Sequence, residues 1–158
     1  MKPVPIRATR HESSRQMMPS DANPSGSVFG GAILKYIDEV SAAVAIRHAR
    51  TKVVTASIER MDFDEPVLIG DLLILKAALI YTGKTSMIVG VRVEAENLLS
   101  GRIVKTGSCF LTFVALNDRG RAVPVAPVEP SDAEEQKWFD RGRKLYELRK
   151  AILKAERS

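Results

Sequence analysis

A glycine-containing segment from Asn23 to Gly31 stands where a loop of turn-forming residues meets an apolar, helix-like pattern. Glycine lets another group approach the backbone closely. The first N–H groups of a helix have no partner within it and carry partial positive charge. Such amides suit an anion, or a carbonyl oxygen that becomes negative during a reaction. Tight packing of a buried helix against a sheet explains the same glycines and is favoured on spacing alone, because the segment matches no standard phosphate-loop motif.

Asp38 lies in the middle of the same helical pattern, between Ile37 and Glu39. One interpretation is a surface carboxylate paired with Lys35 at the i, i+3 spacing, which stabilises a helix by a few tenths of a kcal/mol, roughly. The other is a carboxylate held in a buried crevice, where it activates water or attacks a carbonyl carbon.

The distance between these groups carries a further prediction. Asp38 follows Gly30 and Gly31 by about two helical turns, roughly 10–12 Å along the axis. That is too far for Asp38 and the glycine amides of one chain to act on one reacting carbon. If both groups act, they come from two chains that meet at a shared site, so the spacing predicts a dimer.

The element that must position these residues is a helix from about Val28 to Arg47, for which Ser27 is a suitable N-cap. Apolar residues repeat at i, i+4, i+7 and i+11, the spacing of one buried face, at Ile33, Ile37, Val40 and Val44. Small and apolar residues continue around its other sides. We therefore expect this helix to be buried over most of its surface.

Strand-like segments precede and follow the helix. The predicted strands cover residues 9–18, 53–63, 72–81, 85–96 and 102–116. Short turns join the later ones, which favours antiparallel neighbours. One helix cannot cover both faces of such a sheet. Either the sheet curls around the helix or a second molecule covers the other face.

The C-terminal part of the chain has a different pattern. Three prolines make residues 121–130 a predicted linker. A helix is predicted from Ser131, with Glu134 completing a capping box. Its apolar stripe consists of Trp138, Leu145, Leu148 and Ile152, and Gly142 weakens its middle by about 1 kcal/mol relative to alanine. We expect this helix to pack on the domain or on a neighbouring subunit.

Composition and charge narrow the class of protein. A chain of 158 residues with 45% hydrophobic content fits one globular domain. The net charge of +5 comes from the two ends, because the residues between them carry equal numbers of basic and acidic groups. A nucleic-acid-binding domain more often has a basic face within its fold, so nucleic-acid binding is disfavoured.

The cysteine and histidine content indicates a reduced, cytoplasmic setting without a metal. Cys109 is the only cysteine, so no intrachain disulfide can form, and its position inside a strand favours a buried structural thiol over a nucleophile. His11 and His48 lack the spacing of zinc ligands. The chain shows neither a signal peptide nor an apolar run of the roughly 20 residues that cross a bilayer, and no membrane role is expected.

The segment 21–31 followed by Asp38 resembles the start of the hotdog-fold acyl-CoA thioesterases, specifically the YciA and brain acyl-CoA hydrolase type. The resemblance covers roughly residues 9–127. It continues through Arg47–Arg50, Val53–Ser57, Met61–Phe63, Pro66–Val67, Gly70–Asp71, Gly83–Met87 and Phe113–Leu116. No single piece is specific, but the ordered set is.

The resemblance implies an α+β hotdog fold, in which an antiparallel sheet wraps around a long central helix, with a C-terminal helix added. The hotdog domain would comprise residues 1–127, and residues 128–158 would form a linker and a C-terminal amphipathic helix. The implied assembly is a dimer, assembling further as a trimer of dimers.

The resemblance also implies catalytic roles. Asp38 matches the family's catalytic carboxylate, as general base or nucleophile on the thioester carbonyl. Asn23 would orient water or substrate from the facing subunit. The N–H of Gly31 would polarise the thioester oxygen, and Gly30 would support the turn.

The expected substrate contacts lie elsewhere in the chain. They are Thr55, the turn residues Lys84, Thr85 and Ser86, and, near the end of the helix, Arg47 and His48. Lys84 suits a phosphate of coenzyme A. For Arg47 and His48, complementation of the helix dipole is an equally good explanation. No cofactor is implied, because coenzyme A is part of the substrate.

Two alternatives to a hydrolase remain at this point. One is a hydratase or dehydratase that acts on a thioester on the same fold. Such enzymes usually place a histidine in the active centre, and neither histidine lies between Asn23 and Asp38. The other is a non-catalytic module that binds acyl-CoA, against which the intact Asp38 argues.

Overall fold

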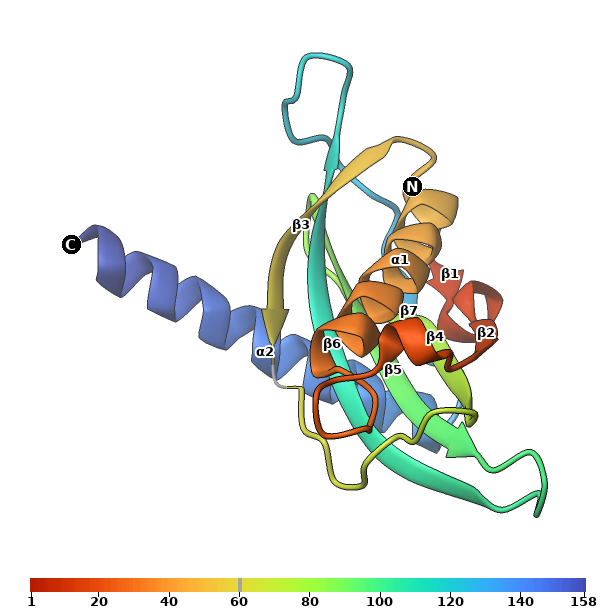
Figure 1. Ribbon diagram of the computed structural model, residues 1–158. Helices are drawn as coiled ribbons and strands as arrows, with labels where there is room; N and C mark the ends of the chain where they lie inside the picture. Colours follow the sequence, from red (N-terminus) through yellow and green to blue (C-terminus); the bar gives the residue numbers. More distant parts are fainter. Residues whose placement is uncertain (60) are drawn as a thin grey trace.

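The computed structural model describes residues 1–59 and 61–158. Its main layer is a five-stranded antiparallel sheet with the strand order β2-β4-β5-β6-β3. The strands are β2 (His11–Gln16), β3 (Lys52–Glu59), β4 (Leu72–Thr82), β5 (Ser86–Glu96) and β6 (Ile103–Leu116). The long helix α1 (Gly30–Ala49) lies across one face of this sheet (Figure 1). The predicted α+β architecture, with a sheet around a central helix, is confirmed.

Short elements tie the two ends of the chain together. Strand β1 (Val4–Pro5) pairs in parallel with β7 (Val128–Glu129), so the predicted linker at 121–130 contains a short strand. The single-turn helices η1 (Ile6–Thr9) and η2 (Pro19–Asp21) flank β2.

The main core lies between α1 and the concave face of the sheet. Ile33, Ile37 and Val44 of the predicted stripe are buried, and Val40 packs against them half-buried. The inward residues of the central strands complete this core, among them Val89, Leu111 and Phe113. Alternation along β5 and β6 therefore places one apolar set against α1.

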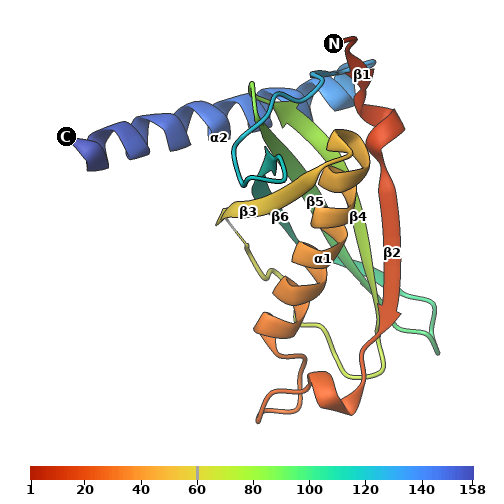
Figure 2. The same ribbon diagram turned by 90° about the horizontal axis from the view of Figure 1, so that it is seen from above.

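The C-terminal helix α2 (Ala133–Arg157) covers part of the other sheet face (Figure 2). A second apolar cluster forms there from Ile80, Ile88 and Phe110, against which Trp138 and Leu145 pack. Of the two explanations for covering the sheet, the structure shows the first, because the sheet curls around α1. A helix of the same chain covers part of the other face. The prediction that the tail helix packs on the domain is confirmed for its first half.

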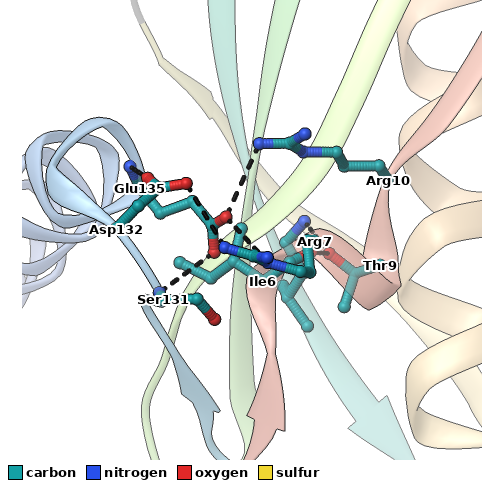
Figure 3. A network of polar contacts seen from close by, with 8 residues as sticks. Ile6, Arg7, Thr9, Arg10, Ser131, Asp132 and Glu135 are labelled. Atoms are coloured by element: carbon teal, nitrogen blue, oxygen red, sulfur yellow. Dashed lines mark hydrogen bonds and ion pairs between the residues drawn. The ribbon is translucent and has the colours of Figure 1, made fainter.

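A buried carboxylate anchors the start of α2 (Figure 3). Glu135 is 2% exposed, and its Oε2 lies 3.4 Å from Arg7 Nε and 3.6 Å from Arg10 Nη2. The N-cap is Asp132, whose side chain accepts from the Glu135 amide at 2.8 Å. The predicted cap at Ser131 with Glu134 is thus wrong by one residue. Glu135 follows the Asp132 cap by three residues, and its Oε1 accepts from the Ser131 amide at 3.2 Å.

The second half of α2 projects away from the body of the molecule (Figure 1). Leu148 and Ile152 of the predicted apolar stripe are 56% and 48% exposed. Only the Trp138 and Leu145 part of that stripe is packed against the domain.

The start of α1 differs from the prediction by two residues. Helix α1 begins at Gly30 rather than Val28, and Ser27 is not its cap. The N-cap is Phe29, which makes no side-chain capping bond. Val28 stays extended because its N–H donates to the Val67 carbonyl at 3.0 Å, a partner that local sequence does not reveal.

The end of β3 also differs. The strand stops at Glu59, so its predicted extension through Met61–Phe63 is wrong, and Arg60 lies outside the described residues. Within the described ranges, no helix is long and apolar enough to cross a membrane. Nor do those residues include three or more His, Cys, Asp or Glu placed to hold a metal ion.

Candidate active site

The loop before α1 is organised by the side chain of Asn23. Its Oδ1 accepts from the amides of Ser25 (2.9 Å) and Ser27 (3.1 Å), and its Nδ2 donates to the Ser27 hydroxyl at 2.9 Å. The Gly26 amide donates to the Asn23 carbonyl, and Gly26 takes a φ of 86°, which favours glycine. Asn23 is therefore a half-buried residue at the centre of a closed turn.

The base of this loop rests on Asp21, which sequence reasoning did not select. Asp21 is 8% exposed; its Oδ1 accepts from the Tyr36 hydroxyl at 2.7 Å and its Oδ2 from the Met18 amide at 2.9 Å. The Tyr36 hydrogen bond, with help from the Met18 amide, holds the pKa of Asp21 below its ordinary value although burial opposes this. The same bond raises the pKa of Tyr36.

The glycines after the loop form the open end of α1. The first amides that the helix itself satisfies are those of Ala32 and Ile33, which donate to the Phe29 carbonyl at 2.9 and 3.4 Å. The N–H groups of Gly30 and Gly31 precede them in the first turn. A Cβ at Gly31 would lie 2.6 Å from the Phe29 ring, so the glycine keeps this helix end uncrowded.

Asp38 reaches the sheet rather than the solvent. It is half-buried, and its Oδ1 accepts from the Thr55 hydroxyl of β3 at 2.9 Å. This bond favours the interpretation of a carboxylate held in a crevice between α1 and β3. Thr55 directly contacts the candidate catalytic carboxylate, and its expected contact with substrate stays a prediction.

The thiol of Cys109 lies close enough to Asp38 to feel its charge, but it is not placed to act as a nucleophile. Cys109 is fully buried on β6, as predicted. Burial raises the pKa of Cys109 to about 11, and the Asp38 charge acts in the same direction. A thiol that stays protonated is a poor nucleophile.

The two parts of the site are separated along α1. Gly31 and Asp38 lie in the same helix, about 10 Å apart along its axis. Asn23 lies in the loop that leads into Gly30 and Gly31, whereas Asp38 contacts Thr55, so one chain holds two separate groups. This is the separation that the sequence spacing predicted.

The turn at Gly83–Ser86 lies at the same end of the sheet as Thr55. In strand register, Ser86 lies opposite Val114, which lies opposite Val54. Two strand spacings place it about 10 Å from β3. Lys84 is exposed, and Thr85 and Ser86 are half-buried. Tyr146 of α2 packs so closely on Gly83 that a Cβ there would lie 2.6 Å from the ring.

The two predicted substrate contacts at the end of α1, Arg47 and His48, differ in their surroundings. His48 Nε2 donates to the Ala126 carbonyl at 2.6 Å and so holds the 121–130 segment against the end of the helix. Arg47 is exposed. Substrate binding by these two residues stays a prediction. His11 lies on β2, at the opposite edge of the sheet from β3, the strand whose Thr55 contacts Asp38.

Comparison with known proteins identifies relatives over most of the chain. The model of the thioesterase superfamily matches residues 25–102. An uncharacterised acyl-CoA thioester hydrolase of Bacillus subtilis is 38% identical over 120 residues, covering 76% of this chain and 70% of the relative. The human cytosolic acyl coenzyme A thioester hydrolase is 32% identical over 96% of this chain, which spans 41% of that longer protein.

Solved structures share the whole fold. A hexameric acyl-CoA thioesterase, solved without ligand, is 40% identical with a TM-score of 0.91, covering 97% of this chain and 98% of its own. The acyl-CoA hydrolase of Staphylococcus aureus, solved with butyryl coenzyme A and coenzyme A, is 33% identical with a TM-score of 0.90, covering 98% and 94%.

Three further structures of the S. aureus enzyme carry single alanine replacements, of an aspartate, a threonine and an asparagine. The sequence spacing among those three positions equals that of Asp38, Thr55 and Asn23 here. The sequence match, the shared fold and this common spacing agree: the chain belongs to the thioesterase superfamily and, within it, to the acyl-CoA thioester hydrolases.

Proposed function

We propose that this protein hydrolyses acyl-CoA to the free carboxylic acid and coenzyme A, with Asp38 as the catalytic carboxylate. The observation that carries this proposal is the hydrogen bond from Thr55 to Asp38, which fixes a half-buried carboxylate between α1 and β3. The identical spacing of the replaced residues in the S. aureus structures supports it.

Two routes suit a carboxylate in this position. As a general base, Asp38 takes a proton from water while the water oxygen bonds to the thioester carbon. As a nucleophile, it forms a mixed anhydride that water then opens. In both, the carbon–sulfur bond breaks and the leaving sulfur ends as the thiol of coenzyme A. The Gly31 N–H stabilises the negative charge that develops on the carbonyl oxygen.

The complete site is proposed to form between two chains. Asn23 and Gly31 of one chain would face Asp38 and Thr55 of its partner, because one chain holds these groups about 10 Å apart. Strand β3 supports this arrangement. It is an edge strand, paired in the sheet with β6 alone, and Val54 and Ile58 on it are each 45% exposed. An edge of this kind is a template for pairing with a second strand.

Substrate binding and assembly complete the proposal. The turn of Lys84, Thr85 and Ser86 would hold coenzyme A, with Lys84 on a phosphate and the hydroxyls on pantetheine or phosphate. The hexameric neighbours support assembly of three such dimers. A cytoplasmic enzyme without a metal or redox cofactor is proposed, since the reaction needs only water and the substrate.

Release of free thiol from a panel of acyl-CoA thioesters tests the activity and finds the preferred acyl chain together. We expect turnover of at least one panel member by the wild-type protein, and loss of most of it in Asp38→Asn with the fold retained. Binding of coenzyme A without turnover of any thioester would replace the enzyme with a binding module.

The shared site has its own test. Asn23→Ala and Asp38→Asn proteins, each nearly inactive, are mixed under conditions that exchange subunits. When equal amounts pair at random, about half of the dimers are hybrids, and each hybrid keeps one of its two sites intact. The mixture should therefore reach about a quarter of wild-type activity. A mixture no more active than its components would place both groups in the same chain's site.

A further inference from the structure

A buried carboxylate that the proposed reaction does not use lies under the Asn23 loop. Asp21 ends η2, is 8% exposed and makes contacts in three directions. Its carboxylate accepts from the Tyr36 hydroxyl (2.7 Å) and the Met18 amide (2.9 Å). Its carbonyl accepts from the Phe29 amide at 2.7 Å. The loop therefore leaves Asp21 and returns to it immediately before α1 begins.

Tyr36 connects this point to the helix and to the sheet. It lies in the second turn of α1, and the Arg15 guanidinium of β2 stacks over its ring at 4.0 Å from the centroid. A cation over an aromatic face and a hydroxyl bonded to a carboxylate restrict the ring from both ends. Asp21, Tyr36 and Arg15, which we name the loop clamp, thus join η2, α1 and β2.

The loop clamp lies at the base of the loop that carries Asn23. Residues 22–28 make bonds within the loop, such as the Asn23 amide to the Ser27 carbonyl at 2.8 Å, and the Val28 amide and the Ser27–Leu68 bridge tie the loop to residues 67–68. Its orientation relative to the Gly30–Gly31 helix end is then set by these ties and by its base. The Asp21 contacts to Tyr36 and to Phe29 form that base.

We propose that the Asp21–Tyr36 pair is a positioning device for catalysis, which holds Asn23 and the first amides of α1 in register and so completes the active site of the partner subunit. This inference rests on the proposed function. Tyr36 and Asp21 touch no reacting atom and act through Asn23 and Gly31.

Because Asn23 and the Gly31 amide act on the developing transition state, the loss should fall on kcat. Misplacement of such groups by about 1 Å costs on the order of 100-fold. We expect Tyr36→Phe, which removes one oxygen atom, to lower kcat about 10- to 100-fold with KM changed less than about threefold. Asp21→Ala should do the same, since its methyl group accepts from neither the Tyr36 hydroxyl nor the Met18 amide.

Tyr81→Phe is the matched control. The Tyr81 ring packs against Phe139 and Tyr146 on the sheet face that α2 covers, away from the loop. This variant loses the same atom and should keep wild-type kcat. Equal kcat in Tyr36→Phe and wild type would overturn the positioning role.

Subunit mixing separates positioning in the partner's site from a general loss of fold. When Tyr36→Phe is mixed with Asp38→Asn, each hybrid dimer pairs the intact Asp38 of the first chain with the intact clamp of the second. Activity should rise above both components toward about a quarter of wild type, as for Asn23→Ala with Asp38→Asn.

The possible results are distinct. If Asn23→Ala complements Asp38→Asn and Tyr36→Phe does not, Tyr36 acts within its own chain and the inference is wrong. If neither complements, the shared site is wrong and the inference fails with it. If the wild-type protein cleaves no acyl-CoA, the proposed function itself fails.

Discussion

Thr55 holds the candidate catalytic carboxylate through one hydroxyl, which makes its side chain a direct test of the site. Thr55→Val keeps the shape of the side chain and removes the donor to Asp38 Oδ1. A hydrogen bond to a charged group contributes about 1.5–3 kcal/mol, so kcat should fall about 10- to 100-fold. Thr55→Ser keeps the hydroxyl and is the control. The measurement is the steady-state kcat of both variants and of wild type. A fully active Thr55→Val enzyme would remove Thr55 from the mechanism.

Cys109 shows how burial suppresses a potential nucleophile beside the candidate catalytic carboxylate. With its pKa raised to about 11 by burial, the thiol remains protonated up to about pH 10 and is fully buried. We expect no reaction of the native protein with a disulfide reagent such as Ellman's reagent at pH 8, and one equivalent per chain after unfolding. Rapid modification of the native protein would contradict this placement. The same inertness lets that reagent report coenzyme A release without background from the enzyme.

At the scale of secondary structure, Gly142 reverses the expectation from helix propensity. Alanine at a helix interior is favoured over glycine by about 1 kcal/mol. In α2, however, a Cβ at this position would lie 2.6 Å from the Tyr81 Cβ and 3.2 Å from Ile80. The Tyr81 Cβ is attached to the backbone of β4 and cannot swing away. Overpacking costs about 1–3 kcal/mol, which outweighs the gain.

We therefore expect Gly142→Ala to lower the midpoint of chemical unfolding. Lys144→Ala, at an exposed position of the same helix, should leave it nearly unchanged. Both are compared at one protein concentration, because the stability of an oligomer depends on it. A Gly142→Ala protein more stable than wild type would mean that α2 does not pack on β4 at this distance.

The same elements show what local sequence can predict. The i, i+4 repeat of α1 and the alternation in β4, β5 and β6 identify these elements because both patterns are local. The first turn of α1 is misplaced because Val28 is held extended by Val67, far along the chain. The predicted cap of α2 is wrong by one residue. Near the observed cap, Glu135 forms ion pairs with Arg7 and Arg10 at the other end of the chain, and local sequence does not reveal these partners.

The candidate site also contains residues that the sequence identifies and a contact that only the folded structure shows. Asn23, Gly31 and Asp38 were recognisable from residue type, spacing and resemblance. The Tyr36 contact with Asp21 depends on how α1 folds back over η2, and no pattern in the sequence marks it. A buried carboxylate beside the loop becomes visible only once the burial of Asp21 is known.

At the scale of the whole molecule, the free edge of β3 is the surface on which the proposed dimer depends. Val54 and Ile58 are each 45% exposed on this strand. Across the two-fold axis of the proposed dimer, these residues of one chain would meet the same strand of the other. Lysine at an exposed edge prevents strand pairing, and like charges placed opposite one another repel.

The double variant Val54→Lys/Ile58→Lys should therefore elute as a monomer in light-scattering chromatography and lose activity, while its far-ultraviolet circular dichroism is retained. Leu99→Lys introduces one lysine at a 101% exposed leucine in the turn between β5 and β6, and should change neither the oligomer nor the rate. Activity and assembly are expected to disappear together because each proposed site takes Asn23 from one chain and Asp38 from the other. A monomeric variant with wild-type kcat would show instead that one chain holds a complete site, in spite of the roughly 10 Å that separates Gly31 from Asp38 along α1.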